Sequence, residues 1–444
     1  WRVFIFKSAR SVTDVGALSQ KYLHDAGSML LRLVIETLKD AFSTLFLAWG
    51  VPFYNLTTTA GYLAMLAAIV LAAVAVGALL LFWAWAGKQN LQAESEPGSA
   101  APSWTVSAFW IGILTIFATL VPVVLANRSV AFNDTFDRYT LVASAGASMV
   151  IVGVLFHFFS ARSRLWITGL LLAVAILTHY NNNVYFSNSW NLQRQAWWQL
   201  SWRAPDLKPD TVLVTLLPPG YRLAESYEVW GPADLIYGTE EQPLKVVGEV
   251  LNEETLFSFL HIESYGRVFR RLPLTIDFKN ALIVSLPGSG SCLHVLDGQA
   301  LELSENEDPM IRLVAGLSKI NLIEPEAEPH TPPEAIFGPA PVHNWCYYYQ
   351  KASLARQIGD WAEVVRLGDE AASQHLTPLD VSEWMPFYQG YARLGRMDEA
   401  NEIGGRLRGE ANFINLYCDQ VRQSGYQPGD SIETFIIDNI CPAQ

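Results

Sequence analysis

GYLAMLAAIVLAAVAVGALLLFWAWAG, residues 61–87, contains no charged side chain, and this stretch decides the fold. A transmembrane helix needs about 20 apolar residues to cross roughly 30 Å of hydrocarbon. A charged side chain at the bilayer centre would cost about 2.5–3.5 kcal/mol on the insertion scale, so a run this long without one strongly indicates a membrane span.

Four other runs extend the pattern on both sides of this stretch. Two of them contain no Asp, Glu, Lys or Arg, and one that ends at Tyr180 is shorter but almost wholly apolar. The first run is entered through the charged stripe Arg32, Glu36 and Asp40, which fits an interfacial entry or a face turned to other helices. We therefore predict a transmembrane region over 1–186 with about five spans, at 33–56, 61–86, 104–126, 139–159 and 165–180.

Charge divides the chain into two unlike halves. Only 16% of its residues are charged, against about 25% in an average soluble chain, which excludes a disordered protein. Residues 1–203 carry a net charge of +5 and residues 204–444 carry −18, within a total of −13. This split predicts a membrane part and an acidic water-exposed part, and the acidic part argues against nucleic-acid binding.

The loop charges predict an orientation. With five spans, one side holds Arg2, Lys7, Arg10, Lys21, Lys88, Arg162 and Arg164, and the short loops of the other side hold Arg128 and Arg138. The positive-inside rule then places the start of the chain in the cytoplasm and the acidic half outside it. We predict a multi-pass protein of the cell inner (plasma) membrane, in contact with membrane lipid.

An aromatic segment at 187–203 follows the last predicted span. Trp190, Trp197 and Trp198 fall on one helical face. The pattern favours a helix at the membrane surface or one packed on the exterior domain, because Trp rings bury their bodies and keep a wet polar edge. The alternative is a stacking platform for sugars or a polyprenyl chain.

The exterior half begins with a predicted α/β domain over 204–322. Short β-branched runs indicate strands at 211–217, 245–250, 281–286 and 292–296, and Asn252 marks the start of a helix over 252–260. Glu324 to Pro341 contains six prolines and predicts an acidic linker over 323–342.

Residues 343–444 follow a helical pattern. Gly359-Asp360-Trp361-Ala362-Glu363-Val364 matches Gly395-Arg396-Met397-Asp398-Glu399-Ala400 at a spacing of 36 residues, and in each match a Gly closes one helix before the next begins. This pattern resembles tetratricopeptide repeats, whose period is about 34 residues and whose stacked helix pairs bind peptides.

All four cysteines lie in the acidic half, where the sequence allows either disulfides or free thiols. Cys292-x-His294 and His343-x-x-Cys346 could supply four zinc ligands, but neither spacing is diagnostic. We predict no metal site. The exterior half shows no recognisable catalytic motif.

The loop NRSVAFNDTFDRY, residues 127–139, concentrates polar side chains between two predicted spans. Asn133 or Asp134 could simply cap the following helix, with Asp137 near its positive end. In a functional interpretation, Arg128 or Arg138 would hold a lipid phosphate through charge-assisted hydrogen bonds, and Asp134 or Asp137 would hold a sugar or metal.

The layout resembles the later part of bacterial GT-C type membrane glycosyltransferases, of the protein O-mannosyltransferase-like and transmembrane-plus-tetratricopeptide groups. The resemblance rests on Asp137-Arg138-Tyr139-Thr140-Leu141, on the small-residue run 143–148, and on the helix-pair pattern at 351–410. It implies transfer of a sugar from a polyprenyl-phosphate donor at the outer membrane face. The implied substrate-binding residues are Arg128, Asp134, Asp137, Arg138 and Tyr139.

The catalytic acid of such families lies on the first external loop, and no counterpart is recognisable in this chain. The sequence begins at Trp1 within an apolar run, so we expect it to be a piece of a longer protein. No catalytic residue is therefore assigned, and no cofactor is predicted. A divalent metal, if one takes part, would be bound together with the missing N-terminal part of the longer protein. The alternative function is a non-enzymatic membrane-anchored protein whose tetratricopeptide-like helices bind a protein or peptide partner.

Overall fold

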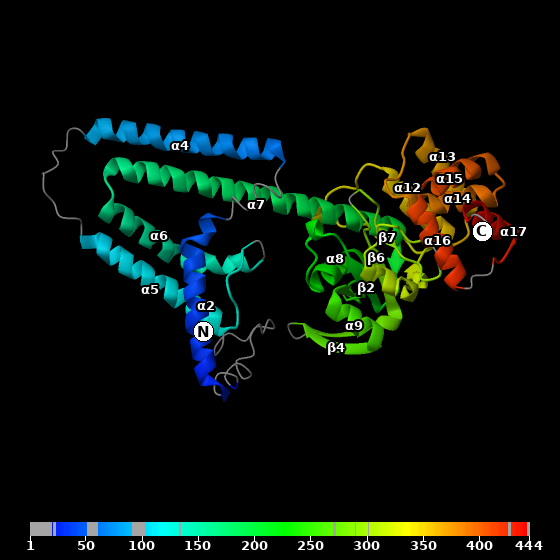
Figure 1. Ribbon diagram of the computed structural model, residues 1–444, viewed down its shortest axis with the longest axis horizontal. Coiled ribbons are helices and arrows are strands. Elements are labelled where there is room, and N and C mark those ends of the chain that lie inside the picture. The colour runs from blue at the N-terminus through cyan, green and yellow to red at the C-terminus, as the bar shows by residue number, and fades with distance from the viewer. Residues whose placement is uncertain are drawn as a thin grey trace. The chain divides into compact units, whose positions relative to one another are not determined.

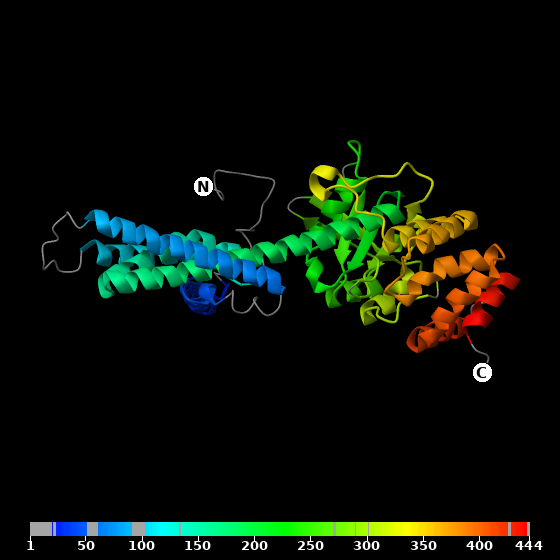
Figure 2. The same ribbon diagram turned by 90° about the horizontal axis from the view of Figure 1, so that it is seen from above.

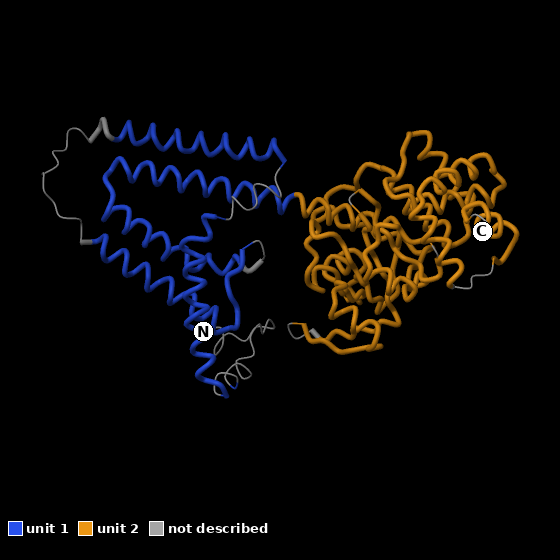
Figure 3. The backbone as a smooth tube through the Cα atoms, in the orientation of Figure 1, with its two compact units in different colours: residues 1–187 blue, residues 188–444 orange. Residues whose placement is uncertain are grey.

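The computed structural model describes residues 20, 24–50, 61–90, 103–132, 135–242, 244–269, 272–288, 290–300, 302–424 and 428–441. The chain forms two compact units, Trp1–Ser187 and Asn188–Gln444 (Figure 3). The boundary between the units falls inside one long helix, so that its two ends belong to different units.

Four helices in the described part of the chain are long and apolar enough to cross a membrane. They are α4 (Tyr62–Asn90), α5 (Ser103–Leu125), α6 (Thr140–Phe158) and α7 (Ala161–Arg203), which match the predicted spans from 61–86 onward. These helices expose large apolar side chains, an arrangement that is unfavourable in water: Leu63 is 84% exposed and Phe158 is 74% exposed. A hydrocarbon solvent accounts for this outward apolar surface.

The predicted span at 33–56 is not among these four helices. Helix α2 (Ala26–Leu45) ends well before residue 56, a single 3-10 turn, η1 (Leu47–Trp49), follows, and residues 51–60 lie outside the described part. Figures 1 and 2 show α2 running across the direction of α4 to α7. The span at 33–56 therefore stays a prediction, because residues 51–56 lie outside the described part of the chain.

Helices α5 and α6 pack closely through three glycines. Because Gly112 and Gly146 have no side chains, the backbones of the two helices approach each other closely at these two positions. Further along, Gly153 faces the backbone of Thr105 and Phe109. Small residues are typical of membrane helix interfaces, because close approach of the backbones supplies the van der Waals contact that holds the helices together.

We expect Gly146→Val to loosen this helix pair. A Cβ atom there would lie 2.7 Å from the Gly112 carbonyl oxygen and 2.9 Å from Ile116 Cγ1, so the helices must separate. The expected loss is about 1–3 kcal/mol, the usual cost of overpacking. SDS unfolding of the purified protein measures it, with Gly77→Val on α4 as control, since nothing lies within 4 Å of the Gly77 position. Equal stability of the two variants would contradict this packing.

The segment predicted as an interfacial aromatic helix is the last part of α7. Trp197, Trp198 and Trp202 are each more than 90% buried, and the Trp198 indole nitrogen donates to the Phe337 carbonyl at 3.5 Å. These rings therefore pack within the second unit, and their burial excludes a stacking platform built from them. Phe337 belongs to a short helix, α11 (Glu334–Phe337), inside the proline-rich segment, and it is fully buried.

The second unit contains a four-stranded sheet in the order β3-β2-β6-β7. The central strand β2 (Thr211–Leu216) pairs in parallel with β3 (Val246–Val250) and β6 (Ala281–Ser285), and β7 (His294–Val295) is antiparallel to β6. These bounds lie close to the four predicted strands. Both faces are buried, with Val212 on one side and Leu213 on the other, as a parallel sheet requires.

Helices and a hairpin connect the strands on the two faces of this sheet (Figure 1). Helix α9 begins after Asn252, whose side chain accepts from the Thr255 amide at 3.0 Å, as predicted. Helix α9 spans Glu253–His261. The elements that were not predicted are α8 (Tyr227–Tyr237), the hairpin of β4 (Ser264–Phe269) and β5 (Leu272–Asp277), α10 (Pro309–Val314), and the pair of β1 (Asp206–Leu207) with β8 (Ile323–Glu324).

The C-terminal region folds into three consecutive helical hairpins within the described residues. Gly359 and Gly395 turn two of them with positive φ angles of 75° and 71°, which glycine adopts without strain. The predicted turns at a spacing of 36 residues therefore exist. The helices are α12 (Trp345–Gln357), α13 (Trp361–Ser373), α14 (Met385–Arg393), α15 (Met397–Gly409), α16 (Ala411–Ser424) and α17 (Ser431–Ile440).

Candidate functional site

The predicted loop site brings two arginines to one tyrosine ring. Arg128 follows the end of α5, and Tyr139 ends the 3-10 turn η2 (Thr135–Tyr139) that leads into α6. Arg128 Nη1 donates to the Tyr139 hydroxyl oxygen at 2.6 Å. The guanidinium carbons of Arg128 and Arg138 lie 5.7 and 5.5 Å from the ring centroid, within cation–π range.

The acidic members of the predicted site behave differently. Asp137 is partly exposed in the 3-10 turn, and its carbonyl accepts from Thr140 Oγ1 at 2.8 Å. Asp134 lies outside the described residues. The predicted cap residues Asn133 and Asp134 both lie outside the described residues, and the 3-10 turn η2 begins directly after them and leads into α6.

Asp40 holds this loop, a role that was not predicted from the sequence. Asp40 on α2 is fully buried, and its Oδ1 accepts from the Val130 amide at 3.1 Å. Its second oxygen, Oδ2, has no hydrogen-bond partner in the described part of the chain. The stripe of Arg32, Glu36 and Asp40 was the available signal, since it fitted either an interfacial entry or a face turned to other helices.

The loop arrangement suits an anion. Arg138 is exposed, and Arg128 is held in place by the Tyr139 hydroxyl. Each guanidinium group lies within 6 Å of the Tyr139 ring centroid and presents forked donors of the kind that match a phosphate. The chemistry available is therefore binding and orienting a phosphorylated group.

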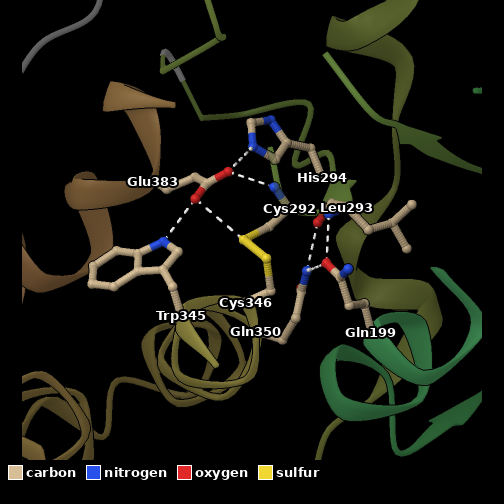
Figure 4. The surroundings of a disulfide bond; sticks show 8 residues. All are labelled: Gln199, Cys292, Leu293, His294, Trp345, Cys346, Gln350 and Glu383. Atoms are coloured by element: carbon tan, nitrogen blue, oxygen red, sulfur yellow. Dashed lines mark hydrogen bonds and ion pairs between the residues drawn. A yellow bond between two sulfur atoms is a disulfide. The ribbon is translucent and has the colours of Figure 1, made fainter. Parts of the chain in front are cut away.

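The second unit contains a buried polar cluster around a disulfide (Figure 4). Cys292, which lies between β6 and β7, is bonded to Cys346 on α12, and Cys418 is bonded to Cys441. The Glu383 carboxylate accepts from the Cys292 amide and from the Trp345 indole, both at 2.7 Å. Because Cys292 and Cys346 bond to each other, they cannot be the zinc thiolates that the spacing allowed.

His294 lies between two buried carboxylates. Its Nδ1 is 3.5 Å from Glu307 Oε1 and its Nε2 is 3.5 Å from Glu383 Oε1. Burial alone would lower the pKa of His294, but the neighbouring Tyr349 and the contacts with Glu307 and Glu383 outweigh it and hold the pKa well above the ordinary value. This environment favours the protonated imidazole.

Two glutamines continue this network to α7. The Leu293 amide donates to Gln199 Oε1 at 2.7 Å, and Gln350 Nε2 donates to the Leu293 carbonyl at 2.5 Å. The segment between β6 and β7 is thus tied to α7, to α12 and, through Glu383, to the 3-10 turn η7 (Val381–Trp384) (Figure 4). Since His294, Glu307 and Glu383 are all at least 96% buried, the cluster fixes the fold rather than meeting a substrate.

No group of three or more His, Cys, Asp or Glu side chains could hold a metal ion in the parts of the chain that the structure describes. Comparison of the chain with family models, with curated proteins and with solved structures gave no match. The geometry of the sites is therefore the basis for a functional conclusion.

Proposed function

We propose that this chain is the C-terminal part of an integral membrane glycosyltransferase that uses a polyprenyl-phosphate-linked sugar donor at the outer membrane face. The observation that supports it is the convergence of Arg128 and Arg138 on Tyr139 at one end of the α5–α6 pair. The arginines would bind the donor phosphate, and Asp137 and Asp134 would lie close to the sugar.

The orientation required by this proposal rests on two observations. Two disulfides in the second unit favour an oxidising compartment outside the cytoplasm. Arg162 and Arg164, between α6 and α7, favour the cytoplasmic side for that short loop. Both the loop 127–139 and the second unit then lie outside, and only the side of the N-terminus depends on whether α2 crosses the membrane.

Binding of a polyprenyl phosphate tests the proposal. We expect the full chain in nanodiscs to retain a bound polyprenyl phosphate in native mass spectrometry. The double variant Arg128→Gln with Arg138→Gln should bind it about 10- to 100-fold more weakly, because charge-assisted hydrogen bonds to the phosphate are lost. The affinity of Arg128→Lys should lie between those of the wild type and the double variant, because Lys keeps the positive charge but lacks the paired N–H donors of the guanidinium group.

The matched control is Arg162→Gln with Arg164→Gln, which removes the same charge from a different loop and should leave binding unchanged. The unphosphorylated polyprenol should bind weakly to all variants. Equal affinity of the two double variants for the phosphate would refute the assignment of the site.

A second candidate function is binding of a protein or peptide partner by the helical hairpins. A cavity of about 240 Å³ between α12, α14 and α17 supports it, with Trp361 and Arg393 in its wall and the Arg393 guanidinium 4.8 Å from the Trp361 ring. Part of this face is already occupied, since Glu302 of the same chain is paired with Arg356. Peptides selected by display on the full chain should lose binding in Trp361→Ala if this function is correct.

A further inference from the structure

A second cavity, of about 670 Å³, opens at the carboxyl edge of the parallel strands β2 and β3. The segment from Ala224 to Ser226 that precedes α8 forms one wall, the first turn of α9 forms the next, and the β4 strand closes it. Loops at the carboxyl ends of parallel strands are where α/β sheets bind ligands. The volume is also within the usual range of about 300–1,000 Å³ for small-molecule sites.

Glu249 is the anchor of this cavity. Its side chain is only 5% exposed, and it lines the cavity near the C-terminal end of β3. Burial raises the pKa of Glu249, and Arg267 and Tyr265 oppose this shift. The Tyr265 hydroxyl donates to Glu249 Oε1 at 3.2 Å and Arg267 Nη1 lies 3.6 Å from the same oxygen, so neither contact uses Oε2.

The charges of the lining select the class of ligand. Glu225, Glu249 and Glu254 would repel an anion, so the cavity does not suit a phosphate or nucleotide. Arg267 lies between Ser226 and Glu249, 3.4 Å from Ser226 Oγ, and offsets part of this negative charge. The lining places carboxylate acceptors beside hydroxyl and guanidinium donors, a set that suits a neutral ligand with several hydroxyl groups.

We propose that this cavity is a saccharide-binding site. Glu249 and Arg267 would hydrogen-bond neighbouring hydroxyl groups of the sugar, and Asn252 and Ser258 would contact the rest of the sugar ring. The site lies wholly within the second unit, so it stands independently of phosphate binding at Arg128. It would give the chain a carbohydrate-recognition function in addition to the one proposed above.

The test is saturation-transfer NMR and calorimetry of the full chain in nanodiscs with a panel of neutral hexoses, N-acetylhexosamines and their disaccharides. At least one sugar should bind, and Glu249→Gln should weaken it about 10- to 100-fold, the range for a lost charge-assisted hydrogen bond. Gln preserves the shape of the buried side chain, so folding should survive.

Arg267→Ala is the second variant, because its side chain is 42% exposed and can be removed without opening the core. It should weaken the same sugar. Glu263→Gln is the matched control: it makes the same change at an exposed carboxylate outside the cavity, and its binding should equal that of the wild type. Failure of every sugar to bind, unchanged affinity in both cavity variants, or binding of spermidine or inorganic phosphate in place of sugar would each overturn the proposal.

Discussion

Removing the Cys292–Cys346 disulfide by paired Cys→Ala substitution should lower the free energy of unfolding of the second unit by about 4 kcal/mol. The bond closes a loop with a sequence separation of 54, and loss of this constraint enlarges the entropy of the unfolded chain by about that amount in the loop-entropy account. It also joins the sheet region to the helical hairpins, so its loss should uncouple their unfolding.

Urea denaturation of the full chain in nanodiscs, followed by tryptophan fluorescence, measures this effect. The matched control is the Cys418–Cys441 pair, whose separation of 23 predicts a smaller loss of about 3 kcal/mol. Only the Cys292–Cys346 variant should split one transition into two, because the other bond lies within the hairpin region. A single transition at the wild-type midpoint would contradict the role assigned to this disulfide.

The sequence predicted the membrane helices well because their signal is local. Charge-free apolar runs identified α4 to α7, because few structures other than a helix satisfy the backbone polar groups of such a run in hydrocarbon. The span at 33–56 stays a prediction, because residues 51–56 lie outside the described part of the chain. The fully buried Asp40 shows that the charged stripe of α2 serves contacts with the loop after α5, and no local pattern specifies that partner.

The same distinction applies to the second unit. Strand and cap signals at Thr211–Leu216 and Asn252 are local and were recognised. The cysteine pairing, the His294 cluster and the cavity at Glu249 depend on residues that only the fold brings together, such as Glu307 and Glu383 around His294. The loop site stays a prediction, and the approach of Arg128 and Arg138 to the Tyr139 ring depends on the 3-10 turn η2, which no local pattern had indicated.

Stability of the second unit should fall as pH rises above about 6.5, because of His294. A histidine whose folded pKa lies above its unfolded value of about 6.5 contributes stability fully below that value, and this contribution is lost as pH rises through the folded pKa. We therefore expect the urea midpoint to be higher at pH 6 than at pH 9, and the part of this change that belongs to the cluster to disappear in His294→Gln.

Glu383→Ala should lower the free energy of unfolding by about 3–5 kcal/mol, because it leaves two buried donors without their acceptor and removes one of the two carboxylates beside His294. The Cys292 amide and the Trp345 indole would both lose their partner, and His294 would lose one of its two carboxylates. Since the imidazole can then become neutral, combining Glu383→Ala with His294→Gln should cost less than the two single losses added together. Urea midpoints of the four proteins give this coupling, and strict additivity would show that His294 is not held as a cation by Glu383.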